Sequence, residues 1–262
     1  MNIHGQILNT LRWTTDKGDA RRSLPPVEVQ HRASFLGHQP VAVTRAEFQF
    51  SGFTAAHLQG VRHRGWRTVS TLVVEVVNAI GAGEPFVYAY YDGVDKIAHE
   101  YGLGDHYVAE VAFVDRLVAD LLVALPPGTC VIVTADHGQV HVGANVVTPA
   151  PEVAARTRLQ SGEGRFRWLH ARAGRVEGLL AAATDAHGAQ AWIVTQEQVR
   201  DELWFGPRLS AAAAARLGDV AMVAREPISF DDPAENGPVF LIGRHGSLTD
   251  DEMLVPLLAA VS

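Results

Sequence analysis

The sequence contains a single cysteine, Cys130, among its 262 residues. One thiol cannot form an internal disulfide, so the fold does not depend on an oxidising compartment. Cys130 begins an apolar run, and a cysteine in a strand is most often a small buried hydrophobe. We therefore expect a structural role for Cys130 and not a nucleophilic one.

The sequence also lacks a recognisable secretory leader and a membrane span. Residues Met1 to Thr10 show no basic segment followed by an apolar one. The best apolar candidate, Thr68 to Ala82, is short for a helix that crosses a bilayer, and it contains Glu75. We expect a cytoplasmic protein with no membrane partner.

An excess of basic residues is missing as well. The chain has 29 acidic and 22 basic residues, with a formal net charge of −7. Binding to a nucleic-acid polymer requires a basic face, so this balance argues against such a partner. It leaves room for a small anionic substrate, because bound cations can reverse the local field. With 47% hydrophobic and 19% charged residues, the composition is that of a folded globular protein.

Strands and helices alternate in the middle of the chain. Helical spacing of apolar residues predicts helices over Arg67–Ile80 and His106–Leu125. Short apolar runs at Val41–Val43, Phe86–Tyr91 and Val131–Val133 predict strands, the last of them buried on both faces. This alternation is typical of an α/β fold, in which a mostly parallel sheet carries helices on both faces.

The segment from His141 to Gly237 has a different pattern, which we interpret as a smaller α+β insertion. We expect a core formed by residues 1–140 and 238–262 and an insertion formed by residues 141–237. Val239–Ile242 would return to the core as a strand, and the Thr249–Glu252 segment would begin a short helix with a capping box. The insertion mixes predicted strands with Ala-rich helices: strands over Phe166–Ala171, Ala191–Val194 and Val220–Val223, and helices near Arg175–Ala183 and Ser210–Leu217.

Acidic and histidine residues follow three of the predicted strands. Asp136 and His137 come directly after one, Asp95 and His99 follow another, and His245 follows a third. Ligands in α/β proteins lie outside the carboxyl ends of strands, so these side chains are expected to converge. Five oxygen and nitrogen donors are too many for one tetrahedral zinc ion. Two neighbouring divalent cations are the natural partition, and such a pair clamps the attacking and leaving oxygens of a phosphoryl group.

Each of these pairs also has a simpler interpretation when taken alone. Asp95 and His99 are four residues apart, which suits a shared ion on one helix face but equally a surface contact. Asp136 can serve as a helix N-cap, with His137 exposed beside it. Only the convergence of three strand ends favours a metal site.

Two arginines of the insertion, Arg165 and Arg167, are candidate substrate-binding residues, because the guanidinium group suits a phosphate. The alternative is a basic hairpin on the surface of the insertion, since nothing in the sequence ties these arginines to the metal motifs. His106, His141 and His170 lie near or between the motifs, and we interpret them as surface or partly buried histidines.

Three motifs in order resemble those of the type I phosphodiesterase/nucleotide pyrophosphatase family of the alkaline phosphatase superfamily. Tyr90–Gly102 is similar to its Asp-x-x-x-His segment, and Val133–Gly138 to its Thr-x-Asp-His-Gly segment. Arg244–Thr249, together with Glu252–Leu257, resembles its C-terminal His-Gly segment. Order and spacing agree, and the resemblance runs from about Leu11 to the C-terminus.

The resemblance implies a role for each of the five candidate ligands. Asp95, His99 and His245 would hold one zinc ion, and Asp136 and His137 would hold a second. The cofactors implied are therefore two divalent metal ions, with zinc as the expected identity.

In the family, the second metal site also takes an Asp and a Thr or Ser whose hydroxyl is the nucleophile. Both normally lie upstream of the region that corresponds to Leu11-Arg12-Trp13, and Met1 to Thr10 contains neither an apolar strand ending in Asp-Gly nor a matching turn. The catalytic nucleophile is thus expected to be missing from this chain. A missing first strand would leave a sheet edge unpaired, which favours a homodimer.

The resemblance implies metal-dependent hydrolysis of phosphodiesters or nucleotide pyrophosphates, with a small phosphate ester or nucleotide as substrate. Two alternatives stay open. One is a non-catalytic metal-binding remnant of the family, and the other is a phosphomonoesterase or phosphonate hydrolase of the same superfamily.

Overall fold

The structure is a computed structural model that describes residues 1–234 and 240–262. Its chain forms two compact units. The first comprises residues 1–7, 97–106 and 135–255, and the second comprises residues 8–96, 107–134 and 256–262. The division into a core of residues 1–140 and 238–262 and an insertion of residues 141–237 stays a prediction.

The second unit contains a small parallel sheet of the kind the sequence predicts. Strand β5 (Val41–Arg45) lies between β6 (Arg62–Trp66) and β7 (Val87–Ala89), and both neighbours run parallel to it. Because β5 is paired on both edges and covered by helix α3 (Val69–Gly81), its apolar residues are buried. The helix starts at the N-cap Thr68, where a capping box with Thr71 satisfies two backbone donors.

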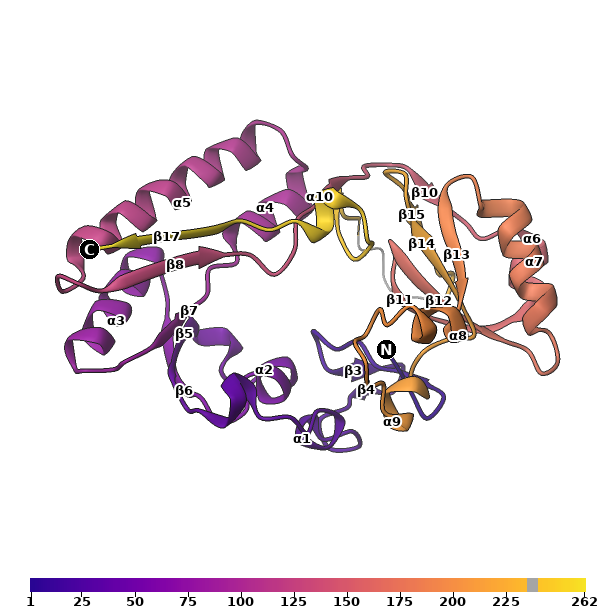
Figure 1. Cartoon of the computed structure of the whole chain (residues 1–262), viewed down its shortest axis with the longest axis horizontal. Helices are drawn as coiled ribbons and strands as arrows, with labels where there is room; N and C mark the ends of the chain where they lie inside the picture. Colours follow the sequence, from indigo (N-terminus) through magenta and orange to yellow (C-terminus); the bar gives the residue numbers. More distant parts are fainter. Residues whose placement is uncertain (235–239) are drawn as a thin grey trace. The chain divides into compact units, whose positions relative to one another are not determined.

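Strand β8 (Cys130–Thr134) departs from the prediction of a buried parallel strand. It pairs with β17 (Leu257–Val261), and the two run antiparallel, side by side in Figure 1. Val131 and Val133 alternate with more exposed neighbours, and Ile132 is 63% exposed. Only one face of β8 packs on apolar partners, so Cys130 is exposed as well. The α/β character is confirmed, but among the described residues the sheets are small and no single large parallel sheet is present.

Two helices follow strand β7 along the chain. Helix α5 (Asp105–Ala124) lies where the sequence predicts a helix, and helix α4 (Gly93–Tyr101) carries the Asp95–His99 pair, whose spacing suits a helix face. Only part of the apolar face predicted for α5 is buried: Leu117 is buried, whereas Val108 is 63% exposed.

The first unit is built on an antiparallel sheet with the strand order β11-β12-β14-β13. Helices α6 (Pro151–Arg156) and α7 (Val176–His187) lie against one face of it (Figure 1). These helices and strands lie within the segment for which the sequence predicts an α+β insertion. The strand bounds are Thr157–Glu163 for β11, Phe166–Ala171 for β12, Ala191–Thr195 for β13 and Val220–Ala224 for β14.

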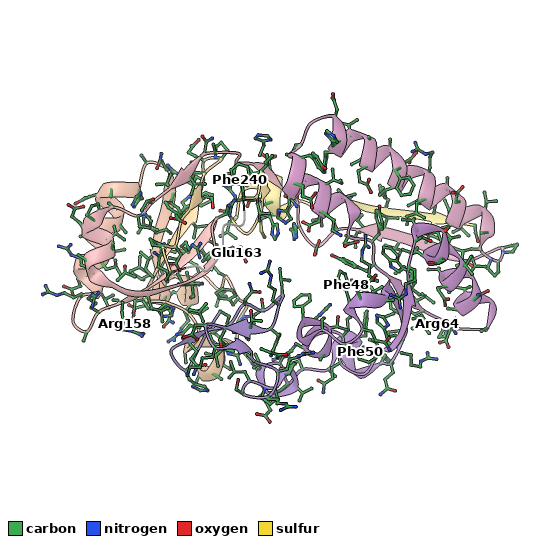
Figure 2. All side chains as sticks on the ribbon, turned by 180° about the vertical axis from the view of Figure 1, so that it is seen from behind. Phe48, Phe50, Arg64, Arg158, Glu163 and Phe240 are labelled. Atoms are coloured by element: carbon green, nitrogen blue, oxygen red, sulfur yellow. The ribbon has the colours of Figure 1, made fainter. Side chains whose placement is uncertain are left out.

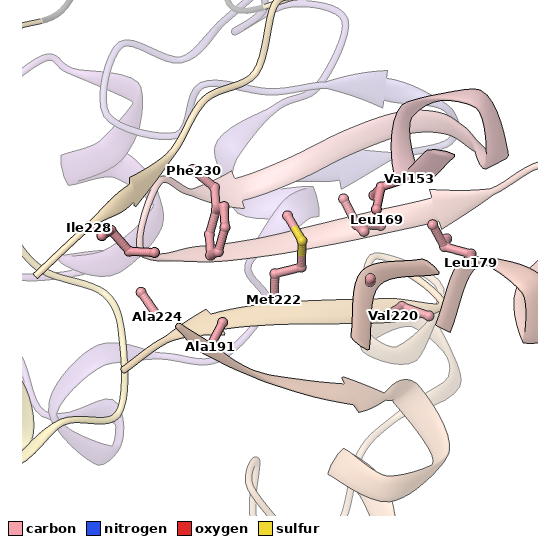
Figure 3. Packing of buried hydrophobic residues seen from close by; sticks show 10 residues of the cluster. Val153, Leu169, Leu179, Ala191, Val220, Met222, Ala224, Ile228 and Phe230 are labelled. Carbon is pink, nitrogen blue, oxygen red and sulfur yellow. The ribbon is translucent and has the colours of Figure 1, made fainter. Parts of the chain in front are cut away.

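Alternation along these strands gives the sheet two apolar faces. Leu169 of β12 and Met222 of β14 pack with Leu179 of α7 in one cluster (Figure 3). Trp168 and Val223, the next residues along, pack in a second cluster on the opposite face. Leu248 packs against that second cluster, so this face of the sheet supports the segment that follows His245.

The remaining elements are short. Phe240 to Ile242, predicted as part of a strand, is not a strand, and Val239 lies outside the described residues. The other strands are β1 (Asn2–Ile3), β2 (Gln6–Ile7), β3 (Thr14–Thr15), β4 (Gly18–Asp19), β9 (Val140–His141), β10 (Val146–Val147), β15 (Ser229–Phe230) and β16 (Gly243–Arg244). The other helices are α1 (Pro26–Val29), α2 (Gly52–His57), α8 (Gln196–Asp201), α9 (Ala211–Ala214) and α10 (Asp250–Met253), with 3-10 turns at Ser34–Gly37 and Ala46–Phe48.

Within residues 1–234 and 240–262, no helix has the length and apolar character needed to cross a lipid bilayer.

A buried histidine makes the first unit sensitive to acid. His187 of α7 is 5% exposed, its Nε2 accepts a hydrogen bond from the Ala150 N–H at 3.1 Å, and burial lowers its pKa. The folded state therefore binds fewer protons than the unfolded state below the unfolded pKa of about 6.5. The free energy of unfolding should fall as the pH is lowered from 7 to 5, by at most about 1.4 kcal/mol per pH unit for this one proton.

The check is chemical denaturation across that pH range for the wild type and His187→Gln, which retains an acceptor without a titrating group. The variant should show the shallower pH dependence. An identical slope in both proteins would contradict the assignment to His187.

Candidate metal centre

Three histidines from separate segments of the chain meet in the first unit. His99 comes from α4, His137 follows β8, and His245 follows β16. The rings of His137 and His245 are stacked, with centroids 3.5 Å apart and planes 12° from parallel. The centroids of His99 and His245 are 5.3 Å apart. A nitrogen of His137 lies within 4.8 Å of a nitrogen of His245, so the two rings offer neighbouring donor atoms.

Backbone carbonyls orient two of these rings. Nδ1 of His99 lies 2.8 Å from the carbonyl oxygen of Gly243, and Nδ1 of His137 lies 2.9 Å from that of Gly138. A carbonyl oxygen only accepts, so each Nδ1 carries the proton and donates it. The lone pair of the neutral ring is then on Nε2, and this second contact is the one that typically fixes a metal-binding imidazole.

The predicted carboxylate ligands sit beside these histidines in the sequence. An oxygen of Asp136 lies 3.7 Å from Nε2 of His137. Asp95 lies one helical turn before His99 on α4, so the two side chains share a face of that helix. The spacing that the sequence suggested is therefore a helical one.

Close backbone packing brings the His137 and His245 segments together. Strands β9 and β16 pair antiparallel, with Gly243 opposite His141. The Gly138 N–H donates to the carbonyl oxygen of Glu252 at 2.9 Å. A Cβ on Gly138 would lie only 2.0 Å from the Asp251 carbonyl oxygen, so glycine is required here for the approach of helix α10.

A groove of about 480 Å³ opens beside the histidines. One wall is apolar and comes from the β11–β12 hairpin and the segment after α8, while Glu163, labelled in Figure 2, adds a carboxylate. The main lining residues are His137, His245, Glu163, Phe166, Trp168 and Phe205. An organic group attached to a phosphate at the histidines would therefore meet aromatic surface.

Arg165, a predicted substrate-binding residue, lies in a buried ion pair. Its Nε and Nη2 each donate to a different carboxylate oxygen of Glu252 at 2.7 Å, and Nη1 donates to the carbonyls of Glu226 and Ile228. Arg165 is 0% exposed and Glu252 is 2% exposed. Removing either partner would leave an unpaired buried charge, which typically costs roughly 3–5 kcal/mol. The guanidinium is thus engaged inside the protein and not on a solvated hairpin surface.

The carboxylate of Glu252 is fully hydrogen-bonded. Burial by itself would raise its pKa, but the hydrogen bonds from Arg165, Thr249 and Ser247 outweigh burial and lower the pKa below its ordinary value. Thr249 and Glu252 were predicted to form a capping box, yet Thr249 makes no side-chain bond to the helix backbone. Its hydroxyl donates to Glu252 at 2.6 Å instead, because the carboxylate is turned toward Arg165. The spacing of Thr249 and Glu252 therefore predicts a helix cap and gives no indication of the ion pair with Arg165.

The other predicted residues occupy different positions. Arg167 is 3% exposed and its Nε donates to the Phe230 carbonyl at 3.2 Å. Its role at a substrate, like that of Arg165, stays a prediction.

His170 is buried and hydrogen-bonded to Ser161 at 2.9 Å, and burial lowers its pKa. His106 is exposed and stacks on Tyr101. The exposed His141 pairs with Gly243 in the β9–β16 ladder.

The donor set of this centre suits a divalent transition metal. Imidazole nitrogens from three segments, two of them oriented by carbonyls, and an adjacent carboxylate are the ligand types that zinc prefers. The residues present therefore fit a bound metal ion.

Comparison with known proteins agrees with these motifs. The sequence profile of the family described as type I phosphodiesterase / nucleotide pyrophosphatase matches residues 22–248. Among curated proteins, none matches the chain significantly.

Solved structures with a similar fold include murine ectonucleotide pyrophosphatase / phosphodiesterase 5, with a TM-score of 0.63, 15% identity and coverage of 85% of this chain and 60% of that one. The human protein of the same name gives a TM-score of 0.62 with 15% identity and the same coverage of 85% and 60%. Phosphonoacetate hydrolase from Sinorhizobium meliloti 1021, solved with phosphonoacetate, gives a TM-score of 0.59, 15% identity and coverage of 85% and 65%.

The chain thus spans between 60% and 65% of the length of these proteins, which share its mixed α/β fold. Their names are those of hydrolases that act on phosphorus compounds. The profile match covers most of the sequence and includes the segments that carry His99, His137 and His245. The chain therefore belongs to the type I phosphodiesterase/nucleotide pyrophosphatase family of the alkaline phosphatase superfamily.

Proposed function

We propose that this protein is a metal-dependent hydrolase of phosphodiesters or nucleotide pyrophosphates. The observation that carries the proposal is the convergence of His99, His137 and His245 from three distant segments, with carbonyl partners on two of the rings. A surface histidine needs no such arrangement. Membership of a metal-dependent family of hydrolases supports the same conclusion.

The proposed ligands fall into two sets. Asp95, His99 and His245 hold one divalent ion, and Asp136 and His137 hold the other, with zinc as the expected metal. A bound pair of such ions polarises the phosphoryl oxygen and stabilises charge on the attacking and leaving oxygens. Helical spacing supports the first set, since Asp95 and His99 share one face of α4.

The chain's own residues orient the site and bind the organic part of the substrate. The carbonyls of Gly243 and Gly138 keep the imidazole protons on Nδ1. The apolar wall at Phe166 and Trp168 excludes water from one side of the groove and contacts the group esterified to the phosphate. The catalytic nucleophile is unknown. Arg165 and Arg167 are candidates for a contribution to substrate binding.

Further expectations belong to this proposal. The metal-binding core corresponds to residues 1–140 and 238–262, and residues 141–237 form the insertion that sets specificity. The substrate is a small phosphate ester or nucleotide, the protein is cytoplasmic, and a homodimer is one assembly open to it. Phosphonate cleavage is the second candidate activity, because phosphonoacetate hydrolase shares the fold.

Removal of one histidine should disrupt metal binding. After zinc loading and removal of excess metal, His245→Ala should retain at least tenfold less zinc at a given free concentration, because a first ligand is lost. Elemental analysis of the dialysed protein measures this. The matched control is His106→Ala, which removes an exposed histidine of the same unit and should bind zinc as the wild type does. Equal zinc content in His245→Ala and the control would rule out His245 as a ligand.

The activity itself is tested with the zinc-loaded chain on bis-nitrophenyl phosphate, nitrophenyl phosphate and phosphonoacetate. We expect the diester to be the preferred substrate and His245→Ala to lower kcat/KM by at least a hundredfold, since charge stabilisation in the transition state is lost. Turnover by the zinc-loaded chain would support the proposed hydrolase and replace the expectation that the chain lacks its nucleophile. Stable zinc binding without turnover of any of the three substrates would identify a non-catalytic member of the family instead.

A further inference from the structure

One buried side chain connects both histidine segments of the metal centre. Glu252 accepts from the Ser247 N–H at 2.9 Å through its carboxylate, and Ser247 is two residues after His245. Its backbone carbonyl accepts from the Gly138 N–H at 2.9 Å, and Gly138 directly follows His137. The two hydrogen bonds start from one residue and end beside two metal-binding candidates.

The insertion holds Glu252 in place. Arg165 lies in the turn between β11 and β12 and grips both carboxylate oxygens at 2.7 Å. Its third nitrogen is anchored on the carbonyls of Glu226 and Ile228, just beyond strand β14. A planar guanidinium with four engaged contacts fixes the carboxylate in both position and rotation.

A separate contact ties the same loop to the sheet. The Ser247 hydroxyl donates to the carbonyl of Ala224, the last residue of β14, and Leu248 packs on the apolar cluster around Trp168. The loop after His245 is therefore attached to this sheet by the Ser247 hydroxyl and the Leu248 side chain.

We propose that Glu252, held by Arg165, is a positioning residue that sets the distance between His137 and His245 and so the geometry of metal binding. The inference rests on the proposed metal-dependent function. In this role Glu252 acts through the two backbone amides of Ser247 and Gly138. In this role the insertion supports the metal centre in addition to lining the groove.

The test compares metal affinity with stability in Glu252→Gln, which retains an oxygen acceptor but loses the ion pair. Titration with Co²⁺ and Zn²⁺ against a competing chelator should show affinity lowered by about 10–100-fold, the range for residues that orient metal ligands. The visible absorption bands of the Co²⁺ protein should change, because they report ligand geometry. In the metal-free protein, the imidazole NMR signals of His137 and His245 should both move.

Leu179→Ala is the matched control, because Leu179 is fully buried in the same unit but packs on the opposite face of the sheet. It should lower Tm while leaving metal affinity, Co²⁺ bands and imidazole signals unchanged. Arg165→Lys keeps the positive charge without the two-pronged grip and should give an intermediate loss of affinity. If Glu252→Gln does not fold, Arg165→Lys and Thr249→Val carry the same comparison, Thr249→Val with the smaller loss.

Lowered metal affinity and shifted imidazole signals in the variants of Glu252, Arg165 and Thr249, but not in Leu179→Ala, would support the proposal. A lower Tm in these variants with wild-type affinity, Co²⁺ bands and imidazole signals would overturn it and leave the proposed hydrolase intact. Failure of the wild-type protein to bind either ion would overturn the proposed function, and this inference with it.

Discussion

The carboxylate of Glu252 is buried away from water, and groups from distant parts of the first unit converge on it to balance its charge. Arg165 supplies a buried counter-charge, Ser247 supplies a backbone amide, and Thr249 supplies a hydroxyl. A buried ion held this completely has essentially one low-energy arrangement, since any displacement leaves a donor or acceptor unpaired. The amides of Gly138 and Ser247 donate to Glu252, so the loops that carry His137 and His245 are held in place by this residue.

Two kinds of contact thus meet at the candidate metal centre. Hydrogen bonds orient single side chains, as the carbonyls of Gly243 and Gly138 do for the rings of His99 and His137. Apolar packing positions whole segments, because Leu248, which follows His245, packs on the cluster around Trp168 of the four-stranded sheet. The β11–β12 hairpin therefore both supports this segment and lines the groove.

Much of the architecture was readable from local sequence pattern. Helices α3 and α5 and strands β12, β13 and β14 lie where apolar patterning predicts them, because each buries a face whose spacing matches its own secondary structure. The pattern failed at β8. Its continuous apolar residues predict burial on two faces and a parallel partner, yet β8 pairs antiparallel with β17 and Ile132 is largely exposed.

By itself, the sequence determined the family and the identities of the candidate ligands, because Asp95, His99, Asp136, His137 and His245 lie in short motifs whose order and spacing are visible without coordinates. It could not determine which distant groups meet. Arg165 and Glu252 lie 87 residues apart, and each had an adequate local interpretation, as a phosphate-binding hairpin and as a helix cap. Only the tertiary structure shows that the two form a buried ion pair, because a buried charge takes its partner from whatever the fold brings into contact with it.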